Sequence, residues 1–259
     1  MSVLPRQLGR HVVVTGASSG IGRAIAERLA AEGAAVSLLA RREGELAETV
    51  EHIREAGGRA LGIQCDVTDA SAVNVAFEIA EGTKGKVHGL VCAAGIGGPN
   101  TAGPDDRFDQ LVATNLGGTY RCIRAFERHI APAGRRDIVV IASVLARFGV
   151  PGYTGYCASK AALLGLVRAS ALELAGANVQ VNAVCPGWVE TEMAWQGIDG
   201  MAAGMGITRE EAHAIAMRAV PLGRMGKPPE VAGLVAWLLS EDAAGVTGQT
   251  LDQNGGAWM

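Results

Sequence analysis

The chain has 259 residues, of which 49% are apolar and only 4% aromatic, and its formal net charge is -3 at pH 7. This length fits one large α/β domain or two smaller ones, and the apolar content is sufficient for a substantial core. The slight negative charge, without any run of Lys or Arg, argues against a nucleic-acid-binding or anionic-membrane-binding surface.

Short runs rich in β-branched residues alternate with helical patterns along the chain. We expect strands near 12–15, 35–39, 60–64, 87–91, 137–142, 179–184 and 248–251. Between them, helices are expected near 21–32, 43–56, 70–82, 105–129, 155–175, 209–219 and 229–240. This alternation, with no linker in mid-chain, predicts a single domain over residues 1–259. Its fold class would be α/β, a Rossmann-type, doubly wound parallel sheet of about seven strands covered on both faces.

A glycine-rich turn lies between the first expected strand and the first helix. Gly16 would allow a tight turn, Gly20 would let the backbone approach a phosphate, and Gly22 would permit close helix packing. Strand, glycine turn and helix in this order are typical of a dinucleotide pyrophosphate site. The residues predicted to bind the cofactor here are Thr15, Gly16, Ser18, Ser19, Gly20, Ile21 and Gly22.

Two arginines, Arg41 and Arg42, follow the second expected strand, where NAD-binding sites carry an acidic residue. Guanidinium groups at this place attract the 2′-phosphate of NADP, whereas a carboxylate would repel it. The pair therefore favours NADP(H) as the cofactor. The alternative is that both arginines are simply solvated at the entry to a helix.

A tyrosine and a lysine share one face of the helix expected at 155–175. Tyr156 and Lys160 are four residues apart, and Ser143 ends the preceding strand. A free tyrosine has a pKa of about 10, and lowering it by about three units takes roughly 4 kcal/mol. An ammonium near ~4 Å supplies about that much at an effective dielectric constant of ~20. The pair therefore predicts an acid–base tyrosine, and the alternative is an ordinary helix that exposes a Tyr and a Lys.

Taken together, these motifs resemble the short-chain dehydrogenase/reductase family over about residues 8–259. Further matches are Cys65-Asp66-Val67, Thr114-Asn115-Leu-Gly117 and the segment 185–191. Within the family the resemblance is strongest to 3-oxoacyl carrier-protein reductases and aromatic polyketide ketoreductases. It rests on the segments 179–193, 207–212 and 221–225.

The resemblance implies a role for each of four catalytic residues. Tyr156 would be the general acid in reduction, and Ser143 would orient the carbonyl and the developing oxyanion. Lys160 would lower the pKa of Tyr156 and hold the nicotinamide ribose, and Asn115 would complete a proton path through a helix kink and a water. The other cofactor contacts that it implies are Asp66, Val67, Ala93, Ala94, Gly95, Tyr156, Lys160, Pro186, Gly187, Val189 and Thr191.

One segment departs from the family pattern. Where the family has Asn-Asn-Ala-Gly, this chain has Cys92-Ala93-Ala94-Gly95, so two side-chain amides are missing while the Ala and Gly that offer backbone contacts are kept. No metal is implied, because the five histidines are dispersed and show no ligand spacing.

The interval 187–220 is the one irregular stretch, and its Trp, Met and Gly content predicts a substrate lid. The alternative is an apolar hairpin packed on a neighbouring subunit. The expected lining of the substrate site is apolar: Ser143, Val144, Leu145, Val150, Tyr153, Trp188 and Met193.

The expected activity is NADPH-dependent reduction of a hydrophobic ketone, a 3-oxoacyl thioester or polyketide that is free or bound to a carrier protein or CoA. A dehydrogenase of a hydroxyacyl-CoA or cyclic secondary alcohol would share these motifs, and a non-catalytic nucleotide-binding protein is a third reading. A basic patch for a carrier protein would draw on Arg124, Arg128, Arg135 or Arg136.

Assembly and location are predicted from helix faces and cysteines. The helices at 105–129 and 155–175 are apolar on more than one face, and in the resembling family they form an interface, so we expect a homotetramer. Five dispersed cysteines without a Cys-x-x-Cys pair, and an N-terminal segment without the apolar core of a signal peptide, predict a cytoplasmic protein with reduced thiols. No membrane segment is expected, because no stretch reaches about 18 apolar residues.

Overall fold

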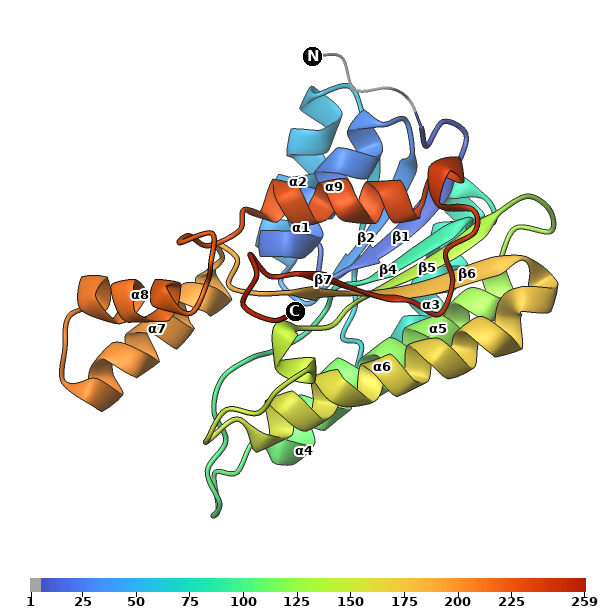
Figure 1. Cartoon of the computed structure of the whole chain (residues 1–259). Coiled ribbons are helices and arrows are strands. Elements are labelled where there is room, and N and C mark those ends of the chain that lie inside the picture. Colours follow the sequence, from blue (N-terminus) through green and yellow to red (C-terminus); the bar gives the residue numbers. More distant parts are fainter. Residues whose placement is uncertain (1–5) are drawn as a thin grey trace.

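The computed structural model describes residues 6–259, so the first five residues of the predicted domain and of its N-terminal segment lie outside it. Its centre is a parallel seven-stranded sheet, as predicted, and the order of its strands is β3-β2-β1-β4-β5-β6-β7 (Figure 1). The strands are β1 (His11–Thr15), β2 (Ala35–Ala40), β3 (Arg59–Gln64), β4 (Gly89–Cys92), β5 (Arg136–Ile141), β6 (Val179–Pro186) and β7 (Thr250–Gln253). The strand order reverses between β1 and β4, which is the switch point at which such sheets bind ligands.

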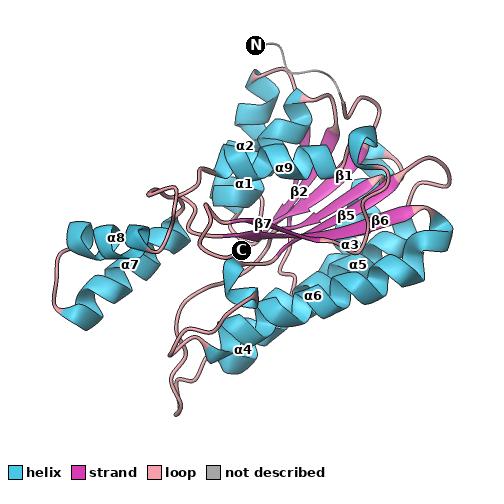
Figure 2. Cartoon of the chain, in the orientation of Figure 1, coloured by secondary structure: helices cyan, strands magenta, loops and turns pink. Residues whose placement is uncertain are grey.

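Helices cover both faces of the sheet (Figure 2). In chain order they are α1 (Gly20–Ala31), α2 (Glu43–Glu55), α3 (Ala70–Lys84), α4 (Phe108–Val112), α5 (Thr119–His129), α6 (Thr154–Leu174), α7 (Glu192–Met205), α8 (Arg209–Arg218) and α9 (Pro228–Leu238). A π-helix at Ala113–Gly118 joins α4 to α5, and short 3-10 turns lie at Val144–Ala146, Ala175–Ala177 and Glu241–Ala243.

The core has one apolar layer on each side of the sheet. Phe77 of α3, Phe126 of α5 and Leu163 of α6 are fully buried against one face. Leu29 of α1 and Val235 of α9 are buried against the other face. The inner strands read as continuous apolar runs because both of their faces are covered, and this is why the sequence pattern predicted them.

The interval 187–220 is largely helical, so the prediction that it is irregular is wrong, although its second helix was expected at 209–219. It forms the helical hairpin of α7 and α8, which projects from the body of the domain (Figure 1). The Thr191 hydroxyl caps α7 by accepting from the amide of Ala194, and Gly206 ends the helix with a φ of 67°. Because the hairpin has an apolar core of its own, centred on Ile198 and Met217, glycines inside α7 do not prevent it from being helical.

Several other boundaries also differ from the prediction. The helix expected at 105–129 begins at Phe108, since Asp106 accepts from the Phe108 amide, and the π-helix interrupts it. The fourth strand is Gly89–Cys92 rather than 87–91, with Val87 reduced to an isolated bridge to Ile130. The last strand is Thr250–Gln253 rather than 248–251.

Candidate active site

The glycine turn after β1 is packed so tightly that two of its glycines admit no side chain. A Cβ on Gly16, whose φ is 68°, would lie 2.7 Å from the backbone nitrogen of Ala94. A Cβ on Gly22 would lie 2.3 Å from the carbonyl oxygen of Gly16. The turn therefore leaves a bare backbone at the start of α1, with Ser18 buried and Ile21 partly buried beside it, and this cradle fits the pyrophosphate of a dinucleotide.

Thr15 fixes the segment that departs from the family pattern. Its hydroxyl oxygen accepts the backbone N–H groups of Ala93 and Ala94, both at 3.1 Å. Cys92 is buried at the end of β4, and burial raises the pKa of its thiol to about 12. The backbone at 93–95 is thus held in place by Thr15 and by the close contact with Gly16, without the two missing side-chain amides.

The two arginines after β2 both lie at this edge of the sheet. Arg42 donates to the hydroxyl of Ser19 at 2.7 Å, and its guanidinium lies 3.3 Å from Glu45 and 3.8 Å from Glu192. Arg41 is more exposed and is 3.9 Å from Asp66. Arg42 therefore contacts the glycine turn, whereas Arg41 lies near Asp66.

Asp66 is oriented by its neighbour Thr68. Its Oδ1 accepts both the backbone N–H and the hydroxyl of Thr68, each at 2.8 Å. Partial burial would raise the pKa of the Asp66 carboxyl, but these two hydrogen bonds and Arg41 outweigh it, so that the pKa is lowered. The adjacent Val67 is buried, and a Cβ on Gly118 would lie 2.5 Å from its Cγ2, which ties this loop to the π-helix.

The segment after β6 closes over the glycine turn. A Cβ on Gly20 would lie 3.1 Å from Cγ2 of Thr191, so these two predicted cofactor residues are neighbours. Pro186 pairs with Gln253 in the sheet, and Gly187 packs against the backbone of Asn254. Val189 is buried and forms an isolated parallel bridge with Gly226.

The predicted catalytic residues meet at the ends of β5 and α6. Ser143 is buried, its hydroxyl accepts the Leu145 amide at 3.1 Å, and its side chain lies near the Tyr156 phenol. Lys160 is also buried, and its Nζ lies 5.8 Å from the centre of the Tyr156 ring. The ammonium donates to the carbonyl of Ile141 at 2.9 Å, so the lysine is anchored to β5 rather than to the phenol.

Burial dominates the proton affinities of this pair. Desolvation raises the pKa of Tyr156, while the hydrogen bond with Ser143 opposes that rise. Desolvation also lowers the pKa of Lys160 to about 8. In the chain by itself the pKa of Tyr156 is thus raised, and its lowering by Lys160 stays a prediction. Spacing on a helix brings the two groups together, but it does not show how strongly burial acts on each of them.

Asn115 lies within the π-helix, which is the predicted kink. Its side chain accepts from the Ile96 amide at 2.9 Å and donates to the Ile96 carbonyl at 3.0 Å and to Ser159 at 3.0 Å. A Cβ on Gly95 would lie 3.1 Å from the Asn115 Oδ1 and 3.4 Å from the Lys160 Nζ. Asn115, Gly95 and Lys160 are therefore neighbours, and the Asn115 side chain joins the loop after β4 to Ser159 of α6.

The predicted substrate residues are not all gathered at one place. A Cβ on Gly97 would lie 2.9 Å from the Met193 sulfur and 3.8 Å from Cε2 of Tyr156, so Met193 faces the catalytic tyrosine. Trp188 instead packs against Gly197 of α7, in the apolar core of the hairpin. Leu145 lies two residues after Ser143, in the 3-10 turn that Ser143 caps, whereas Val150 and Tyr153 flank the turn that leads into α6.

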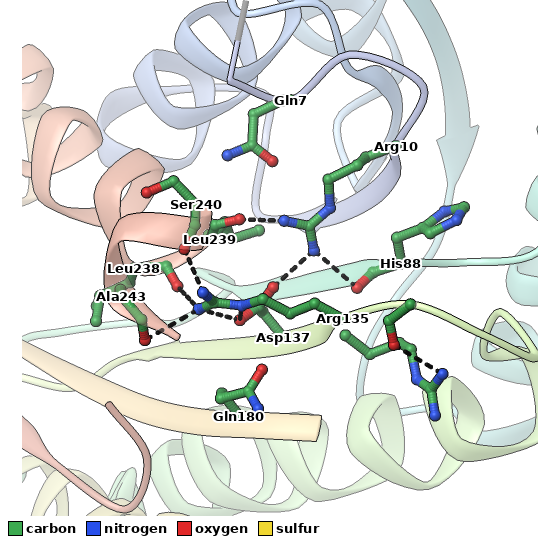
Figure 3. Close-up of polar contacts among 12 residues, drawn as sticks. Gln7, Arg10, His88, Arg135, Asp137, Gln180, Leu238, Leu239, Ser240 and Ala243 are labelled. Carbon is green, nitrogen blue, oxygen red and sulfur yellow. Dashed lines mark hydrogen bonds and ion pairs between the residues drawn. The ribbon is translucent and has the colours of Figure 1, made fainter. Parts of the chain in front are cut away.

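The arginines considered for a carrier surface are of two kinds. Arg124 and Arg128 are exposed on α5, but Arg135 and Arg136 are 9% and 7% exposed and form no surface patch. Arg135 and Arg10 both pair with the buried Asp137, at 2.7 and 2.6 Å (Figure 3). Arg135 also donates to the carbonyl of Leu238, the last residue of α9, and to those of Ser240 and Ala243 just beyond it.

Sequence reasoning missed two polar links beside the catalytic residues. Arg147 forms a bidentate pair with Asp252 of β7, at 3.1 and 2.7 Å, and Asn100 contacts the start of α6. Each link joins residues more than fifty positions apart. No local pattern of spacing could have indicated them.

The loops at the carboxyl ends of β1, β4, β5 and β6 thus bring a phosphate cradle next to the buried Ser143 and Lys160 and the partly buried Tyr156. This arrangement is that of a dinucleotide-dependent oxidoreductase. Within residues 6–259, no three His, Cys, Asp or Glu side chains gather as metal ligands, and none of the helices there is long and apolar enough to cross a membrane.

Comparison with known proteins agrees with this assignment. A family profile described as Enoyl-(Acyl carrier protein) reductase matches residues 16–257. The short-chain reductase protein NovJ of Streptomyces niveus is 41% identical over 247 residues, covering 94% of this chain and 92% of that one. The 3-oxoacyl-acyl-carrier-protein reductase FabG of Escherichia coli K12 is 36% identical over 253 residues, covering 97% and 98%.

Solved structures give the same result. A single-residue variant of actinorhodin polyketide ketoreductase, determined with NADPH, superposes with a TM-score of 0.90 at 37% identity, covering 98% of this chain and 99% of that one. A dehydrogenase/reductase from Sinorhizobium meliloti 1021 gives 0.86 at 36% identity, covering 98% of each. The chain belongs to the short-chain dehydrogenase/reductase family.

Proposed function

We propose that this protein reduces the carbonyl of a hydrophobic ketone, a 3-oxoacyl thioester or polyketide, with NADPH. The observation that carries the proposal is the placement of Ser143, just after β5, beside Tyr156 and Lys160 of α6, at the edge of the sheet that carries the glycine turn. Here a proton donor and a second hydroxyl can both bind the oxygen of one carbonyl group, and both lie beside the dinucleotide cradle. This arrangement suits the addition of a hydride and a proton to a ketone.

Each catalytic residue has one task in this proposal. NADP(H), when bound, supplies the hydride for the carbonyl carbon. Ser143 donates a hydrogen bond to the carbonyl oxygen and holds it against Tyr156, whose hydroxyl then gives its proton to the developing alkoxide. Lys160, with a pKa lowered to about 8, lies close enough to stabilise the phenolate that results and to hold the nicotinamide ribose. Asn115 holds the loop after β4 and supports the proposed proton path.

NADPH rather than NADH is favoured by the position of Arg42. Its guanidinium donates to Ser19 in the glycine turn and has no acidic residue of β2 beside it. The acidic groups near it, Glu45 and Glu192, are both more than 40% exposed. To bind Arg42, a 2′-phosphate would therefore have to replace only two exposed carboxylates, whose attraction to the guanidinium is weakened by solvent, and not a buried ion pair.

The substrate class is inferred from the apolar wall and from the relatives. Met193 and Leu145 offer apolar contacts near Tyr156 and Ser143, and relatives are named for 3-oxoacyl-acyl-carrier-protein and polyketide reduction. The substrate is proposed to be presented free, on CoA or on a carrier protein. The hairpin of α7 and α8 is proposed to act as its lid.

The single-domain protein is further proposed to be a cytoplasmic homotetramer. Tyr120 of α5 and Leu172 of α6 are 49% and 83% exposed, as expected for helix faces that a second copy would cover. Light scattering at micromolar protein concentration tests this assembly. A monomer would contradict it.

Oxidation of NADPH and NADH by the purified protein tests the reaction and the substrate together. NADPH-dependent turnover of an acetoacetyl thioester would support reduction of oxoacyl thioesters, and a preference for a bulky bicyclic ketone would support polyketide-like substrates. Faster turnover with NADH would contradict the role of Arg42. Failure with both ketones, while NADPH still binds, would contradict the substrate class.

A further inference from the structure

The catalytic helix α6 is capped by a residue from a distant loop. The N-cap residue of α6, Tyr153, makes no side-chain capping hydrogen bond. Instead, the Oδ1 of Asn100 accepts the Gly155 amide at 2.8 Å and the Thr154 hydroxyl at 3.2 Å. The first turn of a helix has backbone N–H groups without partners, so Asn100 supplies what the local sequence lacks.

The orientation of the Asn100 side chain is fixed from its other end. Its Nδ2 donates to Oδ1 of Asp106 at 3.1 Å, and the same oxygen accepts the Phe108 amide at 2.9 Å, at the start of α4. The backbone N–H of Asn100 also donates to the carbonyl of Gly152 at 2.8 Å. The amide oxygen therefore faces α6 by necessity, because the amide nitrogen has its partner in Asp106.

The loop that carries Asn100, residues 95–107 and here called the mouth loop, lies beside the reacting groups. Asn115 binds both the N–H and the carbonyl of Ile96, and Arg107 donates to the carbonyl of Gly97 at 3.3 Å. Gly97 lies between Met193 and the ring of Tyr156. One loop thus contacts the apolar wall of the site, the catalytic tyrosine and the start of its helix.

The first turn of α6 has no space in which to rearrange. A Cβ on Gly155 would lie 3.0 Å from Leu111, 3.1 Å from the Phe108 backbone and 3.2 Å from the Asn100 oxygen. Tyr156 follows immediately and is the third residue of the helix. Any shift of Gly155 that follows loss of its hydrogen bond therefore moves the tyrosine backbone as well.

We propose that Asn100 is a positioning residue for catalysis, which keeps Tyr156 in register with the mouth loop and with a carbonyl bound there. The inference rests on the proposed function, because it assumes that Tyr156 transfers the proton. Proton transfer depends steeply on geometry, and a displacement of ~1 Å can reduce the rate by about a hundredfold. Asn100 makes no contact with the glycine turn, so binding of NADPH does not depend on it.

The test compares Asn100→Ala with a swap of the two polar residues, Asn100→Asp combined with Asp106→Asn. The alanine variant should lower kcat about tenfold, as partial misplacement of the tyrosine would, while the Kd and KM for NADPH stay unchanged. In the swap, a carboxylate accepts from Gly155 and from the new amide nitrogen at position 106; because a single oxygen of Asp106 accepts both from Asn100 and from Phe108, the new side chain must turn for its oxygen to reach the Phe108 amide. The double variant should therefore recover kcat to within about twofold of the unmodified protein, while each single variant does not.

Asn74→Ala is the matched control, since Asn74 is an exposed asparagine of α3 that contacts Arg128. If Asn100→Ala keeps full kcat and only its melting temperature falls, Asn100 is a structural cap and the proposal is overturned. If that variant does not fold, the swap decides: a double variant no faster than its singles also overturns the proposal.

Tyr156→Phe, assayed in parallel, separates this proposal from the proposed function. Turnover by Tyr156→Phe would overturn the proposed function itself. An inactive Tyr156→Phe together with a fully active Asn100→Ala would overturn only the positioning role. The structure predicts that Tyr156→Phe is inactive, that Asn100→Ala has a reduced kcat, and that the double variant Asn100→Asp with Asp106→Asn recovers its kcat.

Discussion

Replacement of Lys160 by methionine should make the protein more stable at neutral pH while it abolishes turnover. The ammonium is buried, and its pKa falls to about 8 from 10.5. Below pH 8 the folded chain therefore holds a charge removed from water, at a cost of roughly 3 kcal/mol in the free energy of unfolding. Methionine fills a similar volume without the charge, but the carbonyl of Ile141 loses a donor, worth about 1 kcal/mol.

The net gain for Lys160→Met is thus about 2 kcal/mol at pH 7, and it should depend on pH. Between pH 8 and 10.5 the unfolded chain binds a proton at Lys160 that the folded chain has released, so the stability of the unmodified protein rises with pH. The advantage of the variant should accordingly disappear by about pH 10.5.

Urea unfolding of both proteins at pH 7 and pH 10 measures the difference directly. Both must be at one protein concentration, because self-association contributes to apparent stability. Lys84→Met, at the end of α3, is the control and should give no comparable gain. A variant that is less stable at pH 7, or whose advantage is equal at the two pH values, would refute the reasoning that burial sets the proton affinity of Lys160.

Two further changes test the cofactor site and the buried ion cluster. Arg42→Ala should raise the KM for NADPH about tenfold and leave the KM for NADH unchanged, because only the former carries the 2′-phosphate that the guanidinium would bind; equal effects on both in steady-state kinetics would contradict this. Asp137→Ala should lower the free energy of unfolding by about 3–5 kcal/mol in urea titrations, because Arg10 and Arg135 are left as buried cations without a counter-charge. A loss below about 1 kcal/mol would show that the carbonyls beside α9 are sufficient partners.

Much of the fold could be predicted because its signals are local. The apolar runs of β1 and β5 and the glycines at 16, 20 and 22 reveal a parallel sheet with a phosphate turn, since burial on both faces and close backbone contacts each demand particular residue types. The π-helix around Asn115 was anticipated as a kink only through the family resemblance.

What could not be predicted depends on contacts between distant residues. The helix expected at 209–219 is α8, whereas α7 was not expected, because it depends on an apolar core shared with α8, including Ile198 and Met217, which no single window of sequence reveals. The Asn100 cap joins two loops far apart in the chain. The pKa of Tyr156 is set by how completely the fold removes it from water, and the spacing to Lys160 carries no information about that.

The most direct test of the central claim is turnover by Tyr156→Phe with NADPH and the ketone that the unmodified protein reduces best. Phenylalanine keeps the ring that packs near Gly97 and Met193 and removes only the hydroxyl that contacts Ser143. NADPH binding, followed by the fluorescence of the bound nucleotide, should stay within about threefold of the unmodified protein, while kcat falls by at least about a thousandfold. A variant that binds NADPH and reduces the ketone at the unmodified rate would contradict the assignment of Tyr156 as the proton donor.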